Sequence, residues 1–283
     1  MPLNFNFKNI TIDNKKARFL QLNTEGKPAH FYGANGFPLG TYSEFLKQLS
    51  TQFKLTCLSL RACWPNIGKA PQQTNWEQYA DDLIIFLEQK FREPIVGIGH
   101  SQGATATIIA ASKRPELFKS LILIEPASVT QIMSTTLKLT PYFFKITQQP
   151  FKSALEKNDI WESREAFYQN CRKNKAYKRI SDKVLTDFAE FGLRPIENGK
   201  FTLTFSSEWE LSNYLLAPSI WKYLRKVKIP IQVIAGKPSL FFSQKIREKW
   251  KQVSSNSSIM VNEDYGHLFP LEAPKICAEM INK

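Results

Sequence analysis

The residues best suited to chemistry lie in one short stretch, Gly99-His100-Ser101-Gln102-Gly103, which has the pattern Gly-x-Ser-x-Gly. The hydroxyl of Ser101 could attack a carbonyl carbon as a nucleophile. In a tight strand-to-helix turn, side chains two positions before and after the serine would collide with neighbouring backbone, and Gly99 and Gly103 avoid this collision. The pattern therefore predicts acyl transfer to Ser101. The alternative is an idle serine in a glycine-flanked turn.

A serine hydroxyl becomes a good nucleophile only when a base accepts its proton, and histidine has a suitable pKa near neutral pH. The chain has three histidines. His30 opens an expected strand, and His100 is held inside the serine turn with its ring directed elsewhere. His267 follows the last expected strand in a Tyr-Gly-His-Leu-Phe-Pro loop. We expect His267 to be the base, and a surface histidine without a role is the alternative.

The surrounding segments predict an α/β fold in which parallel strands dominate the sheet and helices cover both faces. The serine turn joins an apolar strand, 95–98, to a helix that begins at Gln102. Strands and helices alternate before and after this unit, as the crossovers between parallel strands require. Expected strands are 8–22 (a hairpin), 27–32, 54–60, 121–124, 229–235 and 258–261, and expected helices are 41–53, 76–91, 243–250 and 270–281.

The alternation stops between residues 127 and 226, where helices are expected at 163–173 and 181–191 and a strand at 200–204. We interpret this stretch as an inserted, mainly helical lid. The predicted organisation is a first core part at 1–126, the lid at 127–226 and a second core part at 227–283. Lid aromatics are candidates for the walls of a substrate pocket, with packing in the core as the alternative for each: Phe143, Phe144, Trp161, Phe167 and Trp221.

The serine turn, a glycine-rich loop after the 27–32 strand and the C-terminal Gly-His loop together resemble the α/β-hydrolase superfamily over nearly the whole chain. Asn35-Gly36-Phe37-Pro38 is similar to the His-Gly-Phe-Pro motif of epoxide hydrolases and haloalkane dehalogenases, with Asn35 in place of histidine. This resemblance implies that the backbone N–H groups of Phe37 and Gln102 form an oxyanion hole. Those two enzyme classes form their covalent ester on an aspartate, so Ser101 argues against both activities.

The acid of the expected triad departs from the commonest pattern of the superfamily. Most relatives carry aspartate in a Gly-x-x-Asp turn after the penultimate strand, but here the turn 236–239 ends in Ser239. Glu125 ends the strand after the serine helix, where a subset of dehalogenase-like relatives keeps its acid, and the order Ser, Glu, His is preserved. Glu125 is therefore expected to orient His267. Asp264 or Glu263, or no acid at all, are the alternatives.

Composition agrees with a globular enzyme. The 283 residues suffice for one large α/β domain, and the 43% hydrophobic content with 21 Phe and 6 Trp suits an apolar pocket or a well-filled core. Four cysteines without a Cys-x-x-Cys pair suggest neither a disulfide framework nor a thiolate metal site. The N-terminus lacks a secretory pattern and no run is long enough to span a membrane, so a cytoplasmic protein is expected. The expected chemistry needs no cofactor and no metal.

The net charge of +13 has three possible explanations: nucleic-acid binding, an acidic protein partner, or a lysine-rich background. The charges are spread along the chain, and the one dense cluster, 172–179, carries no nucleic-acid motif. A solvated helix face explains the cluster most simply, so no nucleic-acid partner is expected. A basic lid facing an acidic acyl-carrier protein would instead favour thioesters or carrier-linked esters.

The sequence thus predicts a serine hydrolase that cleaves a carboxylic ester of a small or medium acyl substrate through an acyl-enzyme on Ser101. One alternative is a thioesterase or acyl-carrier-protein ester hydrolase. Another is a non-catalytic binding protein of the same fold, because the usual aspartate position is empty. The sequence specifies neither the acyl length nor the oligomeric state.

Overall fold

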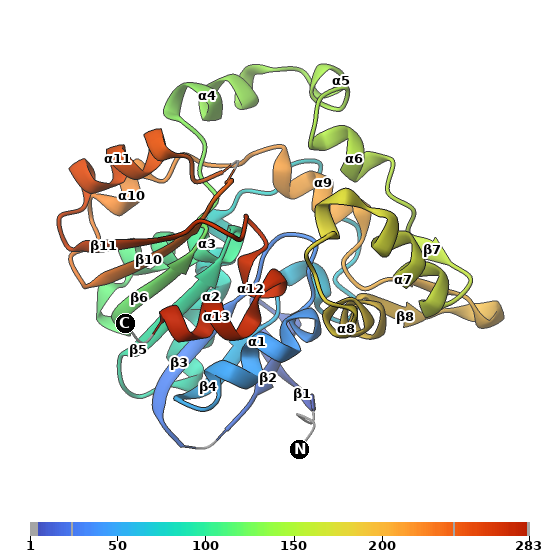
Figure 1. Ribbon diagram of the computed structural model, residues 1–283, viewed down its shortest axis with the longest axis horizontal. Coiled ribbons are helices and arrows are strands. Elements are labelled where there is room, and N and C mark those ends of the chain that lie inside the picture. The colour runs from blue at the N-terminus through green and yellow to red at the C-terminus, as the bar shows by residue number, and fades with distance from the viewer. Residues whose placement is uncertain (1–4, 24, 240, 282–283) are drawn as a thin grey trace.

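A central eight-stranded sheet with the order β1-β2-β4-β3-β5-β6-β10-β11 organises the chain (Figure 1). The structure is a computed structural model and describes residues 5–23, 25–239 and 241–281. β1 pairs with β2, and β2 with β4, in antiparallel fashion, and the other neighbouring pairs are parallel. The strands are β1 (Phe7–Ile12), β2 (Lys15–Gln21), β3 (Lys27–Tyr32), β4 (Phe53–Leu58), β5 (Ile95–His100), β6 (Phe118–Ile124), β10 (Ile231–Gly236) and β11 (Ser257–Asn262).

Helices cover both faces of this sheet, which confirms the predicted α/β class (Figure 1). A first core cluster lies under α2, α3 and α11, and a second lies under α1 and α13. Every residue of β5 is buried, as expected for a parallel strand between two helical layers. These helices and the short α12 are α1 (Ser43–Leu49), α2 (Glu77–Lys90), α3 (Gln102–Lys113), α11 (Gln244–Val253), α12 (Phe269–Glu272) and α13 (Pro274–Met280).

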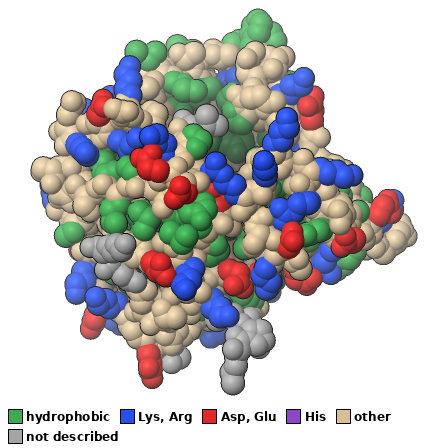
Figure 2. All heavy atoms as spheres, in the orientation of Figure 1, with side chains coloured by type: hydrophobic (Ala, Val, Ile, Leu, Met, Phe, Trp, Pro, Cys, Tyr) green, Lys and Arg blue, Asp and Glu red, His purple; other side chains and the backbone are tan. Residues whose placement is uncertain are grey.

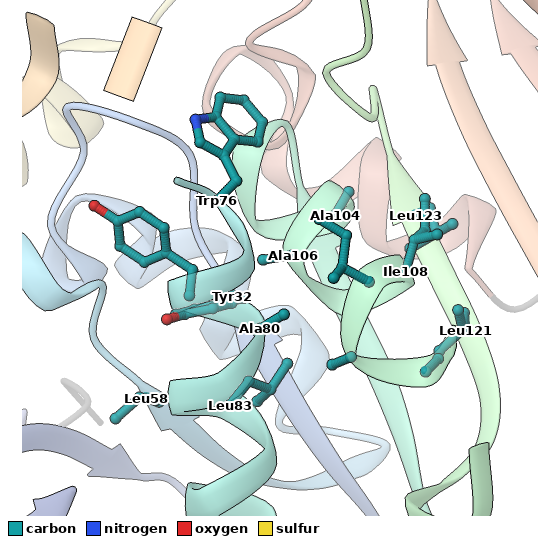
Figure 3. Packing of buried hydrophobic residues seen from close by; sticks show 14 of the residues in the cluster. Tyr32, Leu58, Trp76, Ala80, Leu83, Ala104, Ala106, Ile108, Leu121 and Leu123 are labelled. Atoms are coloured by element: carbon teal, nitrogen blue, oxygen red, sulfur yellow. The ribbon is translucent and has the colours of Figure 1, made fainter. Parts of the chain in front are cut away.

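The close packing of α3 onto the sheet depends on its small residues. Figure 3 shows Ala104 and Ile108 of α3 beside Leu121 and Leu123 of β6. All of these side chains are fully buried. A helix with small residues on its inner face can lie close to the strands, so α3 holds its first turn firmly against the edge where β5 ends.

Two of the expected helices differ from the prediction for local reasons. The helix expected at 41–53 is a 3₁₀ turn, η1 (Leu39–Tyr42), followed by the short helix α1, because β4 already begins at Phe53. The helix expected at 270–281 is divided into α12 and α13 at Ala273, whose backbone is not helical. Pro274 follows Ala273, and the residue before a proline avoids the helical conformation.

Residues 127–226, called the insertion below, connect β6 to β10. Most of their short helices lie in the upper and right-hand parts of Figure 1, whereas α10 lies at the left beside α11. They also form a small three-stranded sheet of order β7-β9-β8. Three helices before residue 160 were not predicted. The elements are α4 (Gln131–Leu139), α5 (Tyr142–Lys145), α6 (Phe151–Leu155), β7 (Ile160–Trp161), α7 (Arg164–Lys173), η4 (Lys175–Tyr177), α8 (Asp182–Gly192), β8 (Leu193–Pro195), β9 (Phe201–Leu203), α9 (Ser207–Tyr214) and α10 (Trp221–Leu224).

The insertion is joined to the core through shared apolar clusters. Phe167 and Phe188 of α7 and α8 belong to the second core cluster, and Trp209 and Trp221 belong to the first. At the α8 contact, the Ser43 hydroxyl donates a hydrogen bond to the carboxylate of Asp187. The insertion is therefore packed on both core clusters.

Basic side chains are scattered over the face in Figure 2 and are interspersed with acidic ones. In the basic cluster 172–179, Arg172 pairs with Asp182 at 2.6 Å and Arg179 lies 3.7 Å from Glu272. Among the described residues, no helix combines the length and the apolar character that crossing a bilayer would require. All four cysteines are free and buried.

Candidate active site

Ser101 occupies a strained turn between the end of β5 and the start of α3. Its φ of 54° and ψ of −117° lie outside the regions that most residues adopt. A Cβ atom on Gly99 would lie 2.5 Å from Ala104 Cα, and one on Gly103 would lie 2.2 Å from the carbonyl oxygen of Tyr32. Any larger residue at either position would force the strand and helix apart, so the two glycines make the turn possible.

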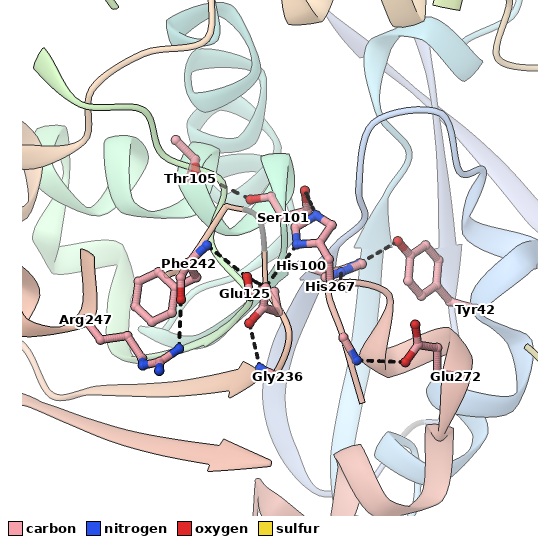
Figure 4. A network of polar contacts seen from close by, with 12 residues as sticks. Tyr42, His100, Ser101, Thr105, Glu125, Gly236, Phe242, Arg247, His267 and Glu272 are labelled. Atoms are coloured by element: carbon pink, nitrogen blue, oxygen red, sulfur yellow. Dashed lines mark hydrogen bonds and ion pairs between the residues drawn. The ribbon is translucent and has the colours of Figure 1, made fainter. Parts of the chain in front are cut away.

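Ser101, His267 and Glu125 form a continuous hydrogen-bonded row across three segments that are distant in sequence (Figure 4). The Ser101 hydroxyl lies 2.9 Å from His267 Nε2, and His267 Nδ1 lies 3.1 Å from Glu125 Oε2. The Glu125 side chain is fully buried, whereas that of His267 is 18% exposed. With the Nδ1 proton donated to the carboxylate, Nε2 is free to accept the serine proton.

Glu125 is held by groups from the end of β10 and from the loop that follows it. One of its oxygens accepts the backbone N–H of Gly236 at 2.6 Å, and the other accepts the hydroxyl of Ser239. Ser239 in turn accepts the N–H of Phe242 at 2.9 Å. Ser239, at the position where most relatives would carry the acid, thus orients the carboxylate that comes from β6.

The other acids considered beside the histidine lie elsewhere. Glu263 pairs with Lys237 at 2.6 Å, and both side chains are more than half exposed. Asp264 is exposed, and its backbone N–H donates to the side chain of Asn262. In residues 5–23, 25–239 and 241–281, neither carboxylate has a hydrogen bond or ion pair with His267, which has Glu125 as its partner.

His100 ties the serine turn to two neighbouring loops. The backbone N–H of Ala34 donates to the Tyr42 hydroxyl at 3.0 Å, so this hydroxyl donates onward to His100 Nδ1 at 2.8 Å. His100 Nε2 then donates to the carbonyl oxygen of His267 at 2.8 Å. Burial lowers the pKa of His100 to about 3, so the ring is neutral as this bonding requires. The third histidine, His30, is also buried and accepts the N–H of Leu58 at 3.1 Å.

The backbone N–H groups of the loop after β3 differ in whether they are already hydrogen-bonded. The N–H of Phe37 donates to the carbonyl of Ala34 at 3.3 Å within a turn, so it is not free for a substrate oxygen. The N–H of Asn35 has no acceptor among the described residues, and Asn35 lines the same cavity as Ser101. The N–H of Gln102, as the first of α3, has no partner within the helix. The implied pair of Phe37 and Gln102 stays a prediction, and the hydrogen bonds of the loop make the N–H of Asn35 a second candidate beside Gln102.

The side chain of Asn35 fixes this loop to the insertion. Its amide donates to the carbonyl of Glu210 at 3.0 Å, and its oxygen accepts the amide of Asn213 at 2.8 Å. Asn213 is fully buried and also accepts the hydroxyl of Tyr79 at 2.8 Å. Asn35, in place of the histidine of the similar motif, therefore anchors the start of the loop to α9.

The cavity at Ser101, called the serine cavity below, is small, apolar and close to the nucleophile. Its volume is about 90 Å³. The lining residues come from the core and from both ends of the chain stretch called the insertion: Ala34, Asn35, Phe37, Trp76, Ser101, Gln102, Ala127, Ser128, Val129, Tyr214, Ala217, Phe241, His267 and Leu268. The side-chain amide of Gln102 is buried with no partner in the described part of the chain. Sequence reasoning missed this amide, although its place beside Ser101 was a signal.

The aromatic residues expected on the pocket walls do not line the serine cavity. Phe143 and Phe144 lie at the surface with 61% and 57% of their area exposed, and Trp221 packs in the core against Trp250. Trp161 and Phe167 line a different cavity inside the insertion. Residue type does not reveal which aromatic side chains of the insertion face inward. Across the described residues, no group of three or more His, Cys, Asp or Glu side chains suits a metal ion.

Comparisons with known proteins point to one fold and to several activities. The chain is 32% identical over 105 residues to a type I acyl-CoA thioesterase of Penicillium roqueforti, covering 36% of this chain and 23% of that protein. It is 22% identical over 220 residues to the 2-(acetamidomethylene)succinate hydrolase of Mesorhizobium japonicum, covering 74% and 71% of the two chains. The match to the thioesterase thus spans about a quarter of that relative's length.

Solved structures resemble the whole chain. The crystal structure of E-2-(acetamidomethylene)succinate hydrolase has a TM-score of 0.82 at 18% identity and covers 99% of this chain and 98% of its own. The thioesterase domain from the curacin biosynthetic pathway has a TM-score of 0.76 at 14% identity, covering 99% and 100%. At these identities the likeness establishes the fold. Residues 31–274 match the family model for the alpha/beta hydrolase fold, and the chain therefore belongs to the α/β-hydrolase family.

Proposed function

We propose that the protein is a serine hydrolase that cleaves a carboxylic ester of a small or medium acyl substrate. The observation that carries the proposal is the row of contacts from Ser101 Oγ to His267 Nε2 at 2.9 Å and from His267 Nδ1 to Glu125 at 3.1 Å. Membership of the α/β-hydrolase family and relatives named thioesterase, methylesterase and hydrolase support it.

In the first half-reaction, Ser101 Oγ attacks the ester carbonyl while His267 Nε2 takes its proton. The negative charge that develops on the carbonyl oxygen is stabilised by the N–H groups of Asn35 and Gln102 at the N-terminal end of α3. Loss of one such donor typically raises the barrier by about 2.7–4 kcal/mol. The imidazolium, stabilised by Glu125, then gives its proton to the leaving alcohol, and the acyl group stays on Ser101.

In the second half-reaction, water replaces the alcohol. His267 removes a proton from this water as its oxygen attacks the acyl carbon, and a second tetrahedral oxyanion occupies the same donors. When this second tetrahedral intermediate breaks down, His267 returns the proton to Ser101 Oγ and the carboxylic acid is released. Every proton in this sequence moves through Nε2, so the fixed orientation of the His267 ring is essential.

The direct test is labelling with a fluorophosphonate probe, which reacts with an activated serine and not with an idle one. We expect stoichiometric labelling of the wild-type protein, with the adduct on Ser101 in a peptide map, and no labelling of Ser101→Ala. Turnover of p-nitrophenyl acetate should disappear in the same variant. An unlabelled wild-type protein that is folded by circular dichroism would favour the non-catalytic binding protein.

Thioester cleavage is a second candidate, favoured by the two thioesterases among the relatives and similar structures. The same geometry can release a thiol in place of an alcohol, because the thiolate is a better leaving group and needs less help from His267. Comparison of kcat/KM for an acyl-CoA and for the matching p-nitrophenyl ester decides between them. If an acidic acyl-carrier protein is the substrate, turnover must fall as salt screens the net charge of +13; a rate insensitive to salt contradicts that partner.

A further inference from the structure

Building on the proposed ester hydrolysis, we infer that a second cavity inside the insertion completes the substrate site and holds the far part of an uncharged, medium-length acyl chain. This insertion cavity has a volume of about 390 Å³. It lies among α6, α7, α8, η4 and α9, on the right-hand side of Figure 1. It is lined by Pro150, Ser153, Ala154, Glu156, Lys157, Asn158, Trp161, Phe167, Asn170, Cys171, Asn174, Tyr177, Phe188, Glu210 and Tyr214.

The two cavities are adjacent and share one lining residue. Tyr214 lines both of them. Phe37 lines the serine cavity, and its ring lies 5.2 Å from the ring of Phe188 and 6.1 Å from that of Tyr177, both of which line the insertion cavity. The Glu210 carboxylate also reaches the loop after β3, since a Cβ atom on Gly36 would lie 3.1 Å from it. The side chains of Phe37 and Tyr214 therefore stand between the two spaces.

The volumes require such a connection for any substrate larger than a short acyl ester. Ligand sites usually measure about 300–1,000 Å³, and the serine cavity, at about 90 Å³, is far below that range. The insertion cavity alone, at about 390 Å³, falls within it. The serine cavity can therefore hold the reacting ester, while the remainder of a longer substrate needs the larger space.

The chemistry of the lining favours an uncharged chain. The rings of Trp161, Phe167 and Phe188 form the apolar part of the wall, with Trp161 and Phe167 at 5.2 Å in edge-to-face contact. Neutral polar side chains form much of the rest: Ser153, Asn158, Asn170 and Asn174. The cation in the lining, Lys157, is 2.6 Å from Glu210 and is neutralised by it. Glu156 adds a further negative charge to the lining. Glu156 lies 3.8 Å from Lys152, which does not line the cavity. A carboxylate on the bound chain would therefore meet no free cation in the described lining.

The insertion cavity lies on the side of the serine cavity that the acyl part of the ester, rather than its alcohol part, would occupy. His267 must protonate the leaving group, so the alcohol lies on the His267 and Phe241 side of the serine cavity, where the two rings are 4.6 Å apart. The insertion cavity adjoins the serine cavity through Phe37 and Tyr214, beside the loop that carries the oxyanion donor Asn35. The chain on the carbonyl carbon therefore extends toward Tyr214.

The test fills the larger cavity without touching the nucleophile. Asn170 lies at its exposed rim, and the neighbouring Gln169 is exposed and does not line it. We expect Asn170→Trp to lower the ratio of kcat/KM for p-nitrophenyl octanoate to that for p-nitrophenyl acetate by at least tenfold. Gln169→Trp is the matched control and should keep the wild-type ratio. An unchanged ratio in a folded Asn170→Trp variant overturns the inference.

Two further measurements separate this inference from the proposed function. Tyr214→Ala removes the shared wall and should raise the octanoate-to-acetate ratio, and wild-type protein should prefer octanoate to the charged monoester of adipic acid. In Ser101→Ala, which cannot turn over an ester, methyl octanoate should change the tryptophan fluorescence, and the change should vanish when Trp161→Phe is added. If methyl octanoate binds but the wild type turns over no ester, the proposed hydrolysis is refuted and the acyl-binding role of the insertion cavity stands. If the wild type turns over the acetate ester but methyl octanoate does not bind, the acyl-binding role is refuted and the hydrolysis stands.

Discussion

At the scale of single residues, the carboxylate and its supporting serine come from different strands. Glu125 reaches His267 from the end of β6, while Ser239, in the loop after β10, donates to the same carboxylate oxygen that contacts the imidazole. Ser239 is therefore adjacent to the carboxylate oxygen that contacts the imidazole.

We predict that Glu125→Gln lowers kcat for p-nitrophenyl acetate by about 10⁴-fold, because the amide no longer stabilises the imidazolium or fixes its tautomer. Adding Ser239→Asp to that variant should recover at least tenfold of the loss by returning a carboxylate to the other position. Steady-state kinetics of the two variants and of Ser239→Asp alone provide the comparison. Equal rates for Glu125→Gln and the wild type would assign the acid role elsewhere.

The lowered pKa values of the two buried histidines determine how the free energy of unfolding depends on pH. Burial lowers the pKa of both His30 and His100 from 6.5 to about 3. Between pH 3 and 6.5 the unfolded chain therefore binds more protons than the folded one, so stability is lost as the pH falls through this window. Each histidine contributes a slope of about 1.4 kcal/mol per pH unit. The free energy of unfolding, measured by urea denaturation at several pH values, should depend less steeply on pH in His30→Gln than in the wild type. An equal pH dependence in the two proteins would contradict the lowered pKa of His30.

The sequence was sufficient to select three side chains that the structure brings into one hydrogen-bonded row. Ser101, His267 and Glu125 stand out because few other side chains can act as nucleophile, base and acid in that order. The oxyanion donor could not be predicted in the same way, because every residue has an N–H and only the turn geometry shows that Phe37 uses its own. The resemblance to a four-residue motif implies Phe37, whereas the hydrogen bonds leave the N–H of Asn35, two residues earlier, available for a substrate oxygen.

At the scale of elements, the contact between η1 and α8 controls how the insertion sits on the core. A Cβ atom on Gly40 would lie 1.9 Å from Cγ of Phe191 in α8. Glycine is needed there because the aromatic ring lies directly on the backbone. The same contact is reinforced by the Ser43 and Asp187 hydrogen bond one turn further along the chain.

We predict that Gly40→Ala lowers the free energy of unfolding by about 1–3 kcal/mol, as expected for overpacking at a tight contact. The control is a double-mutant cycle with Phe191→Ala, in which the two changes should be strongly non-additive because the smaller side chain makes room for the methyl group. Additive losses in chemical denaturation would show that the ring is not the partner that Gly40 accommodates.

Elements with a regular apolar period were the predictable ones. The hairpin expected at 8–22 and the helix expected at 76–91 are found as β1, β2 and α2. The helices α4, α5 and α6 were missed because their buried surface is small, and α4 buries only Ser134 and Leu137. Short helices of this kind are stabilised by the neighbours they contact rather than by their own pattern.

At the scale of the whole molecule, the insertion and the core share their apolar interior. Side chains from α7 and α8 belong to the same cluster as those of α1 and α13, and α9 and α10 contribute Trp209 and Trp221 to the other. Neither core cluster belongs to one part alone. We therefore propose that the segments 1–126, 127–226 and 227–283 act as one folding unit.

We predict a single cooperative thermal transition for the full chain, because removal of the insertion would expose apolar surface of both clusters. Calorimetry should give equal calorimetric and van't Hoff enthalpies, the usual criterion of two-state unfolding. An isolated 127–226 fragment, as the comparison, should show no cooperative transition. Two resolved transitions in the full chain would instead establish the insertion as an independent domain.

The burial of the four thiols has a practical consequence for the enzymology. Burial raises the pKa of Cys57, Cys63 and Cys171 to about 12 and that of Cys277 well above its ordinary value, so almost no thiolate exists at neutral pH. Iodoacetamide should leave the native protein unmodified and fully active, and alkylation should begin only in denaturant. Mass spectrometry of alkylated samples would then give the fraction of molecules that have unfolded at each time, so the four cysteines report the rate of unfolding without an added label.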